Sequence, residues 1–363
     1  MILITGSAGF IGAHVVQRLL SQGHQVVGID NHNPYYDPAL KARRLEALTG
    51  QPGYIHVRGD IAAPGLVSEV CRQYGPGRIV HLAAQAGVRH SMVDPHAYVQ
   101  SNLVGFVNVL EAARHHAVRH VIYASSSSVY GEGGPRPLAE DAPTDQPLSL
   151  YGATKKANEL IAYSYAHLYA MRCTGLRFFT VYGPWGRPDM APMLFANAIL
   201  DGAPVVLFNH GHNARSFTYI DDIVDGVVRV LQSGDEGAAE PPDLARVFNI
   251  GNPVSTPLPA FVSSLSRALG RKARLQFAPP AAADATETTA DTRLFEATFG
   301  PQQFTALDAG LARFAHWMRG ECAQRVDRRR APRRRAPRRR THAGAAASTA
   351  ALCMDPSPAP GTP

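Results

Sequence analysis

The sequence has few of the features that mark secreted, membrane-spanning or metal-binding proteins. No apolar run approaches the roughly 18 residues that a membrane-spanning helix needs. The N-terminus, MILITGSAGF, has neither a basic segment nor a long apolar core, so we predict no signal peptide. The 363 residues include only four cysteines, without metal-ligand spacing. We therefore predict free thiols in a reducing cytoplasm, no membrane span and no metal site.

Most of the chain also lacks a net charge. The formal charge of +7 comes from 36 basic and 29 acidic residues, but ten arginines and two aspartates lie in 325–363. Residues 1–324 therefore carry 26 basic and 27 acidic side chains. We predict that 325–363, with its RRRAPRRRAPRRR repeat, is a disordered tail, because like charges repel and apolar residues are scarce. The tail either contacts nucleic acid or an anionic surface, or has no role in the chemistry.

Short apolar runs alternate with helical patterns in the first half of the chain. This alternation predicts an α/β fold in which residues 1–180 form a Rossmann-type, doubly wound parallel sheet that binds NAD. The predicted strands are 2–5, 25–29, 54–57, 78–82, 120–124 and 173–178. The predicted helices lie near 10–22, 38–48, 64–74, 96–116 and 151–170.

Beyond residue 180 the pattern becomes shorter pieces interrupted by proline and glycine. We predict that 181–324 forms mainly a smaller C-terminal α/β lobe that binds substrate at the carboxyl edge of the sheet. The predicted helices lie near 190–202, 221–232, 257–269 and 306–319. The predicted strands lie near 204–208, 246–250 and 273–277.

A glycine-rich turn, GSAGFIG, follows the first predicted strand and opens the first helix. Gly6, Gly9 and Gly12 permit a tight turn and a close approach of the backbone, and a helix N-terminus attracts a pyrophosphate. Asp30 ends the second strand, where a carboxylate accepts the ribose hydroxyl protons and repels a 2′-phosphate. The pattern therefore predicts NAD rather than NADP. The residues predicted to contact it are Gly6, Gly9, Phe10, Ile11, Gly12, Asp30, Asn31, Asp60, Ile61, Leu82, Ala83, Ala84, Tyr151 and Lys155.

Tyr151 and Lys155 are four residues apart in YGATK, after a run of serines at 125–128. Positions i and i+4 share a helix face, so the spacing predicts an ammonium beside a phenol. A neighbouring positive charge lowers a phenol pKa toward neutrality and makes it a general base. With a serine hydroxyl and a nicotinamide nearby, the pattern favours oxidation of an alcohol.

The motifs together resemble the extended short-chain dehydrogenase/reductase family of nucleotide-sugar enzymes. More narrowly, several strings are similar to those of UDP-glucuronate 4-epimerases. These strings are GIDNHNPYYD, HLAAQAGVRHS, YASSSSVYG, LYGATKKANEL, LRFFTVYGPWGRPDM and FTYIDDIV. The resemblance covers roughly residues 1–320. The sequence departs from the family at His90, where tyrosine is common, and at Ser216, where aspartate is usual.

The resemblance implies a mechanism and a set of site residues. Tyr151 would take the proton of the sugar 4-hydroxyl while NAD accepts the C4 hydride, Ser126 would be the catalytic serine, and the 4-keto sugar would rotate before hydride returns. Lys155 would lower the tyrosine pKa and hold the nicotinamide ribose. The resemblance implies that Arg89, Thr180 and Arg187 bind the carboxylate of the sugar and that Arg215 binds the UDP phosphates. The other substrate contacts implied are Ser126, Ser127 and Ser128, with Asp284 and Thr289 on the uridine side.

Other activities remain open at this stage. UDP-glucose or UDP-N-acetylhexosamine 4-epimerisation would use the same Ser–Tyr–Lys set. Dehydratases and decarboxylases of the superfamily carry an acidic residue before V-Y-G, where this chain has serines, so both are disfavoured. A scaffold that binds NAD without catalysis is a further alternative. The resemblance also implies a homodimer formed through the helices near 96–116 and 151–170.

Overall fold

A computed structural model of the chain describes residues 1–233 and 243–330. Residues 1–322 form one compact unit. A second unit begins at Ala323, and the structure describes it only as far as Arg330, the end of the last helix. No helix among the described residues has the length and apolar character needed to cross a bilayer.

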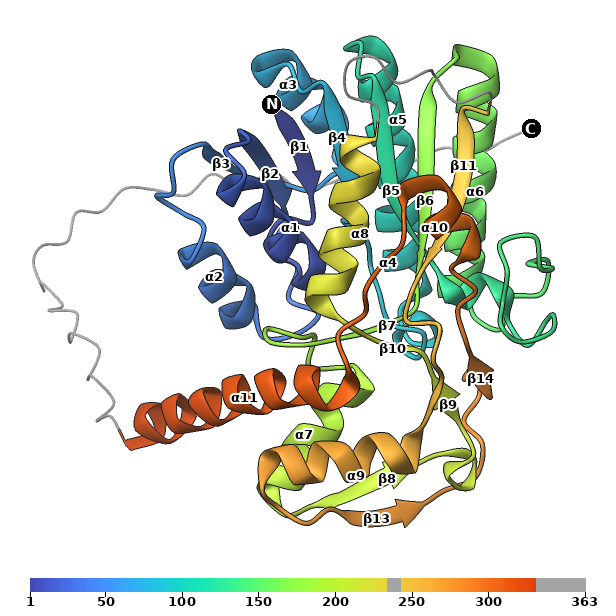
Figure 1. The fold of residues 1–363 in the computed structure, drawn as a ribbon. Helices are drawn as coiled ribbons and strands as arrows, with labels where there is room; N and C mark the ends of the chain where they lie inside the picture. The colour runs from blue at the N-terminus through green and yellow to red at the C-terminus, as the bar shows by residue number, and fades with distance from the viewer. Residues whose placement is uncertain (234–242, 331–363) are drawn as a thin grey trace, which may run out of the picture. The chain divides into compact units, whose positions relative to one another are not determined.

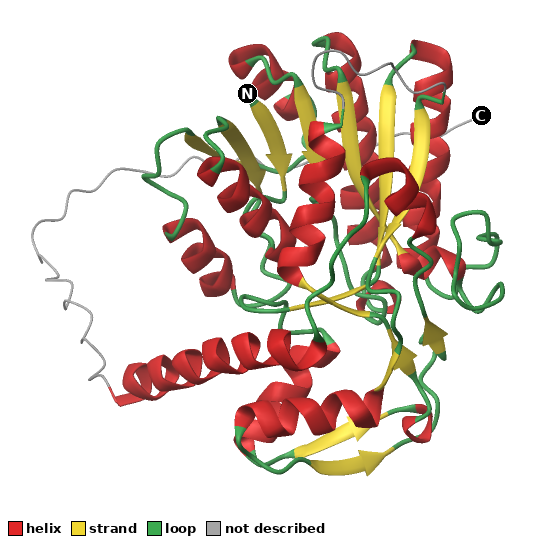
Figure 2. Cartoon of the chain, viewed as in Figure 1, coloured by secondary structure: helices red, strands yellow, loops and turns green. Residues whose placement is uncertain are grey.

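A parallel sheet of seven strands lies at the centre of the compact unit, in the order β11-β6-β5-β4-β1-β2-β3 (Figures 1 and 2). Every pairing between neighbouring strands is parallel. The α/β fold class predicted from the sequence is confirmed. The strands are β1 (Ile2–Thr5), β2 (Val26–Asp30), β3 (Tyr54–Arg58), β4 (Arg78–His81), β5 (His120–Ser126), β6 (Arg172–Phe178) and β11 (Ala245–Ile250).

Helices cover both faces of this sheet because its strands are apolar on both sides. One face packs against α1 (Phe10–Ser21) and α8 (Ile220–Gln232), which contact each other. The other face packs against α3 (Leu66–Tyr74), α5 (Gly105–His115) and α6 (Leu150–Tyr169) (Figure 1). The remaining helices around the sheet are α2 (Pro38–Glu46), α4 (Pro95–Tyr98) and α10 (Arg293–Phe299). A wide π-helical segment, Val99–Val104, joins α4 to α5 in the region predicted as one helix.

Shorter elements form a lobe at the carboxyl ends of the strands. Strands β8 and β13 pair in parallel, β9 pairs with β12 and β14, and β7 pairs with β10. Helices α7, α9 and the first part of α11 pack with these strands. The lobe elements are β7 (Thr180–Tyr182), α7 (Ala191–Asp201), β8 (Pro204–Leu207), β9 (Ala214–Arg215), β10 (Phe217–Tyr219), β12 (Thr256–Pro257), α9 (Leu258–Leu269), β13 (Arg274–Phe277), β14 (Glu287–Thr288) and α11 (Leu307–Arg330).

The division between sheet and lobe differs from the sequence pattern. Strand β11 and helix α8 were expected in the lobe, but β11 pairs with β6 and α8 packs on α1. Local periodicity identifies a strand or a helix without indicating which sheet it joins. Helix α11 continues to Arg330, so the first residues of the predicted tail are helical. Residues 331–363 lie outside the described residues, and their disorder stays a prediction.

Candidate active site

A cavity of about 1030 Å³ lies where the lobe meets the carboxyl ends of the sheet strands. Open α/β sheets bind ligands at this edge. All the residues predicted to contact cofactor or substrate line the cavity, with the exception of Thr289. The Thr289 hydroxyl instead donates to Glu287 at 2.8 Å, and the neighbouring Thr288 lines the cavity. Thr288, the last residue of β14, thus faces the cavity where Thr289 was expected to do so.

The glycine turn leaves the N-terminus of α1 open to an anion. Gly6 has φ +73°, and a Cβ on Gly12 would lie 2.1 Å from the Gly6 carbonyl oxygen, so no larger residue fits there. Gly9 caps α1 without a side chain, and no acidic residue occupies the first turn. The helix N-terminus therefore presents amide groups and a positive dipole end to the cavity.

Asp30 stands beside this turn at the end of β2 and is buried. Its carboxylate accepts the Ala8 amide at 3.1 Å and the His32 amide at 2.8 Å, and it pairs with Lys41 at 3.2 Å. A buried acceptor next to a helix N-terminus suits a ribose diol attached to a diphosphate. The residues present therefore fit a dinucleotide.

Tyr151 and Lys155 both face the cavity from the first turns of α6. Ser149 caps this helix by accepting the Gly152 amide at 3.1 Å. Lys155 is almost fully buried, and its ammonium donates to the Ala124 carbonyl at 2.8 Å. Burial lowers the pKa of Lys155 to about 8. The expected helix face is therefore present, with the lysine held under the end of β5.

The electrostatics of Tyr151 differ from the prediction. Burial is the largest effect and raises the pKa of Tyr151 above its usual value. The charge of Arg187 and a hydrogen bond with Ser126 lower that pKa. Spacing alone predicted that Lys155 would supply the lowering charge. In the structure the charge that lowers this pKa is that of Arg187, which is distant in sequence and lines the same cavity.

The serines after β5 have separate partners. The Ser125 hydroxyl donates to Glu159 at 2.6 Å and is turned away from Tyr151. The Ser126 hydroxyl bonds to Tyr151, donates to the Ser128 hydroxyl at 3.1 Å and accepts the Ser128 amide at 3.1 Å. Among these serines, Ser126 is thus the one that contacts the phenol.

A buried ion pair supports the catalytic helix from behind. Arg177 on β6 binds Glu159 on α6 in a bidentate manner, at 2.8 and 2.9 Å, and both side chains are 5% exposed. Arg177 also donates to the Tyr130 hydroxyl and the Glu140 carbonyl, each at 2.9 Å. This network joins α6, the serine run and β6.

Arg187 enters the same part of the cavity from the loop before α7. It binds Asp189 through two hydrogen bonds of 3.1 and 2.6 Å, and Asp189 also accepts the Tyr35 hydroxyl at 3.0 Å. Burial, followed by the Asp189 charge, raises the pKa of Tyr35 to about 12, so Tyr35 stays a neutral donor. Arg187 is thus a cation partly neutralised by Asp189, in the same cavity as the Tyr151 phenol.

A second set of cations lies at the far end of the cavity. Arg215 pairs with Asp284 at 2.6 Å and donates to the carbonyls of Thr286 and Ala285. Arg89 approaches the same carboxylate at 3.9 Å and stacks over the Phe208 ring at 4.3 Å. Residues 284–286 are therefore tied to strand β9 through the Arg215 guanidinium.

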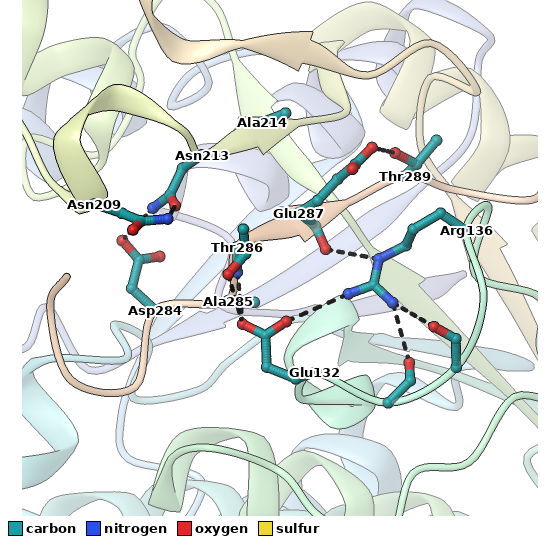
Figure 3. A network of polar contacts seen from close by, with 12 residues as sticks. Glu132, Arg136, Asn209, Asn213, Ala214, Asp284, Ala285, Thr286, Glu287 and Thr289 are labelled. Carbon is teal, nitrogen blue, oxygen red and sulfur yellow. Dashed lines mark hydrogen bonds and ion pairs between the residues drawn. The ribbon is translucent and has the colours of Figure 1, made fainter.

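Figure 3 shows how the segment that carries Asp284 is held from the catalytic side. Glu132, four residues after Ser128, accepts the Thr286 amide at 2.7 Å and its hydroxyl at 3.2 Å. Arg136 donates to the Glu287 carbonyl at 3.0 Å and lies 3.6 Å from Glu132. The loop after the serine run and the 284–287 segment are thus fixed to each other.

The sequence matches the family model described as the NAD dependent epimerase/dehydratase family over residues 2–251. The chain belongs to this family. The match runs from β1 to the end of β11, and so it covers the whole sheet, the glycine turn and the catalytic helix of this epimerase/dehydratase family member.

Several relatives of this family member are known. A probable UDP-glucuronate 4-epimerase from Rhizobium meliloti is 43% identical over 326 residues, covering 87% of this chain and 96% of the relative. UDP-glucuronic acid 4-epimerase from Bacillus cereus, whose crystal structure contains UDP-glucuronic acid and NAD, is 32% identical to this chain in sequence. The two structures align with a TM-score of 0.82 over 88% of this chain and 99% of the Bacillus cereus chain. A UDP-glucose 4-epimerase from Thermotoga maritima, solved with UDP-glucose, is 27% identical with a TM-score of 0.79, covering 88% and 99%.

Two side chains important to the site of this epimerase/dehydratase family member were missed from the sequence. Asp189 follows Arg187 closely in WGRPDM, and that proximity was an available signal. Arg44 lies in a helix with no motif and reaches the glycine turn only through the fold. His90, one of the departures from the family, packs against Tyr35 with the ring centroids 4.5 Å apart and the planes tilted by 44°. The other departure, Ser216, accepts the Ala290 amide and does not line the cavity.

Proposed function

We propose that the chain is an NAD-dependent isomerase that interconverts UDP-glucuronate and UDP-galacturonate by epimerisation at C4. The observation that carries the proposal is the meeting of Tyr151, Ser126 and Arg187 in one cavity. A base and a hydroxyl suit removal of a proton from an alcohol, and a guanidinium suits a carboxylate on the same sugar. Two of the similar proteins, from Rhizobium meliloti and Bacillus cereus, are a probable UDP-glucuronate 4-epimerase and a UDP-glucuronic acid 4-epimerase.

The proposed roles follow from the contacts of each residue. Tyr151 acts as its phenolate, the form that the Arg187 charge favours, and becomes a neutral phenol on taking the proton of the 4-hydroxyl. Ser126 donates a hydrogen bond to the same oxygen as it becomes a carbonyl. Arg187 and Thr180 bind the uronate, with Ser127 and Ser128 beside them, while Arg89, Arg215 and Asp284 hold the nucleotide end. When bound, NAD supplies the acceptor and then the donor of the C4 hydride. After the sugar has rotated to present its other face to the hydride donor, Tyr151 returns the proton to the same oxygen.

We assign the binding of NAD to the glycine turn, Asp30 and Lys155. The α1 N-terminus receives the diphosphate and Asp30 the adenosine ribose. Lys155, fixed by the Ala124 carbonyl, is placed to donate to the nicotinamide ribose. Since the hydride is returned in each turnover, the reaction consumes no cofactor.

Incubation of the purified chain with UDP-glucuronate tests the proposal. We expect UDP-galacturonate to appear without added NAD, measured by chromatography of the nucleotide sugars. Formation of UDP-xylose would replace the proposal with decarboxylation, and no product from any UDP-sugar would indicate a scaffold.

UDP-glucose 4-epimerisation is the second candidate, because Arg187 is already paired with Asp189. A guanidinium with a carboxylate partner attracts a uronate less than one without it. Competition between UDP-glucuronate and UDP-glucose decides between the candidates. A higher kcat/KM for UDP-glucose would overturn the uronate assignment while leaving the epimerase chemistry in place.

The Glu132 contact yields a prediction about nucleotide binding. Glu132→Ala removes the acceptor of the Thr286 amide and hydroxyl. The segment that carries Asp284 then loses these hydrogen bonds to the loop after the serine run. A partly exposed bond of this kind contributes about 1 kcal/mol, so we expect KM for the UDP-sugar to rise roughly fivefold with kcat unchanged. Initial-rate kinetics measure both constants.

Glu287→Ala provides the control for Glu132→Ala. Glu287 lies on the same segment, and its carboxylate accepts the Thr289 hydroxyl outside the cavity. We expect wild-type kinetics from this variant. A Glu132→Ala enzyme with an unchanged KM, or with only kcat reduced, contradicts the prediction.

We also propose that the chain is a homodimer formed through α4–α5 and α6. Leu160 and Tyr163 lie three residues apart on α6 and are 57% and 60% exposed. Val99 and Val104, at the ends of the segment that joins α4 to α5, are exposed as well. Apolar side chains gathered on neighbouring helices are typical of a self-complementary interface.

Leu160→Arg tests the dimer. Two arginines would meet near the symmetry axis, and we expect the variant to elute as a monomer in light-scattering chromatography. Leu294→Arg, a change at another exposed leucine on α10, is expected to leave the mass unchanged. A wild-type monomer, or a dimeric Leu160→Arg, contradicts the proposed interface. The cytoplasmic location and the contact of the basic tail with nucleic acid or an anionic surface stay predictions.

A further inference from the structure

Arg44 on α2 is a buried cation whose hydrogen-bond partners are neutral. The residue is 3% exposed. One terminal nitrogen donates to the Ala8 carbonyl at 3.1 Å and the Tyr36 hydroxyl at 2.8 Å. The other donates to the Trp185 carbonyl at 2.5 Å and the Gly186 carbonyl at 3.5 Å. Every acceptor that Arg44 uses within the described residues is therefore uncharged.

The first of these contacts fixes the glycine turn. Ala8 stands between Gly6 and Gly9, and its amide donates to Asp30 while its carbonyl accepts from Arg44. The two charged side chains thus orient the peptides on both sides of Ala8. A turn held in this way keeps the N-terminus of α1 directed at the cavity, where a diphosphate binds.

The second contact fixes the loop that carries Arg187. Trp185 has φ +63°, a left-handed conformation that costs a residue with a side chain of order 1 kcal/mol. Arg44 stabilises this conformation by donating hydrogen bonds to the carbonyls of Trp185 and Gly186, directly before Arg187. The position from which the Arg187 side chain starts therefore depends on the Arg44 guanidinium.

The charge of Arg44 adds an electrostatic reason for the arrangement. Burial lowers the pKa of Arg44, since a buried guanidinium loses hydration. The carboxylate whose charge raises the pKa of Arg44 is that of Asp30, which is already paired with Lys41. An anion at the glycine turn would supply the compensating charge.

We propose that Arg44 is a positioning residue that couples the dinucleotide site to the Arg187 loop, so that cofactor retention and substrate binding depend on one guanidinium. The part that concerns the sugar rests on the proposed function. The part that concerns NAD does not, because it needs only the glycine turn and its contacts.

Arg44→Met and Arg44→Lys test the coupling, with Arg43→Met as the matched control. Arg43 is the neighbouring residue on the same helix, and it pairs with Glu321 at 2.6 Å and lies over the Trp185 ring at 5.1 Å. Three quantities are measured: NAD retained per chain after gel filtration, KM for UDP-glucuronate at saturating NAD, and the Kd of UDP by calorimetry. Thermal unfolding checks that each variant is folded.

For Arg44→Met we expect at least a tenfold loss of NAD affinity and a tenfold rise in KM. The Kd of UDP should be unchanged, because the acceptors of Arg44 are Ala8, Tyr36, Trp185 and Gly186 and do not include the Arg215–Asp284 pair. Arg44→Lys should have an NAD affinity and a KM between those of the wild type and Arg44→Met, since one ammonium cannot reach carbonyls of both loops with the geometry of a planar fork. Arg43→Met should retain NAD.

Full NAD occupancy with a normal KM in Arg44→Met overturns the proposal. A variant that loses NAD but has a normal KM once NAD is added to saturation also overturns it, because the two sites are then not coupled. If Arg44→Met does not fold, unchanged NAD retention and KM in Arg44→Lys have the same meaning. A wild-type chain that turns over no UDP-uronate, yet loses NAD on substitution of Arg44, would refute the proposed function and leave the assignment of Arg44 to the cofactor site intact.

Discussion

Replacing Tyr151 by phenylalanine is expected to lower kcat for UDP-glucuronate epimerisation by roughly 10²- to 10⁴-fold. The substitution removes the only group of this side chain that can carry a proton and leaves the ring in its contact with Tyr98, at a centroid distance of 6.2 Å. NAD retention should be unchanged, because the glycine turn and Asp30 are untouched. Single-turnover and steady-state rates, with the absorbance of bound NAD, measure the two quantities.

Tyr163→Phe is the matched control for this prediction. Tyr163 lies on the same helix outside the cavity, and phenylalanine keeps the ring that the proposed dimer interface uses, so loss of its hydroxyl should leave kcat within twofold of wild type. A Tyr151→Phe enzyme that keeps more than a tenth of the wild-type kcat would exclude Tyr151 as the base. Loss of bound NAD in that variant would instead assign the phenol mainly to cofactor binding.

The largest effect on stability is expected from Arg177→Met. The change leaves the Glu159 carboxylate buried without its bidentate partner and also removes donors from the Tyr130 hydroxyl and the Glu140 carbonyl. Breaking a buried pair by removing one partner costs about 3–5 kcal/mol, so the free energy of unfolding should fall by that amount. Urea denaturation followed by tryptophan fluorescence and circular dichroism measures it.

Two further variants show whether the missing charge is the cause. Arg177→Met combined with Glu159→Leu removes both charges, and we expect it to recover part of the stability lost in Arg177→Met. Arg72→Met breaks an exposed pair with Glu69 and should leave the unfolding midpoint unchanged. If Arg177→Met is as stable as wild type, the network does not support α6.

The residues of the site could be predicted from the sequence where each motif is local and fixed to a strand end. The glycine turn follows β1, Asp30 ends β2 and Ser126 ends β5, and the carboxyl ends of parallel strands meet at one edge. Tyr151 and Lys155 needed only the helix period. These positions are determined by the chain within a few residues of each motif, so pattern located all of them except Ser126, which the family resemblance singled out among the serines.

Contacts between distant segments could not be predicted in the same way. The Arg187 charge reaches Tyr151 from a loop 36 residues further along the chain, and helix spacing suggested Lys155 instead. Arg44 contacts carbonyls 36 and 141 positions away. Their partners are backbone atoms, which carry no sequence signal. The lobe boundary was missed for a related reason, since strand pairing is decided by the whole sheet.

The return of the chain to the sheet after the lobe limits how chimeric enzymes can be built. Cutting at residue 180 would remove β11 and α8, leaving the backbone groups of β6 unpaired at an edge and the apolar face of α1 uncovered. An exchange of substrate lobes between relatives must therefore move three separate segments, 183–216, 251–292 and the first part of α11 from Leu307, while β10, α8 and β11 stay with the host. Specificity in this fold is transplanted as several separate inserts rather than as one C-terminal half.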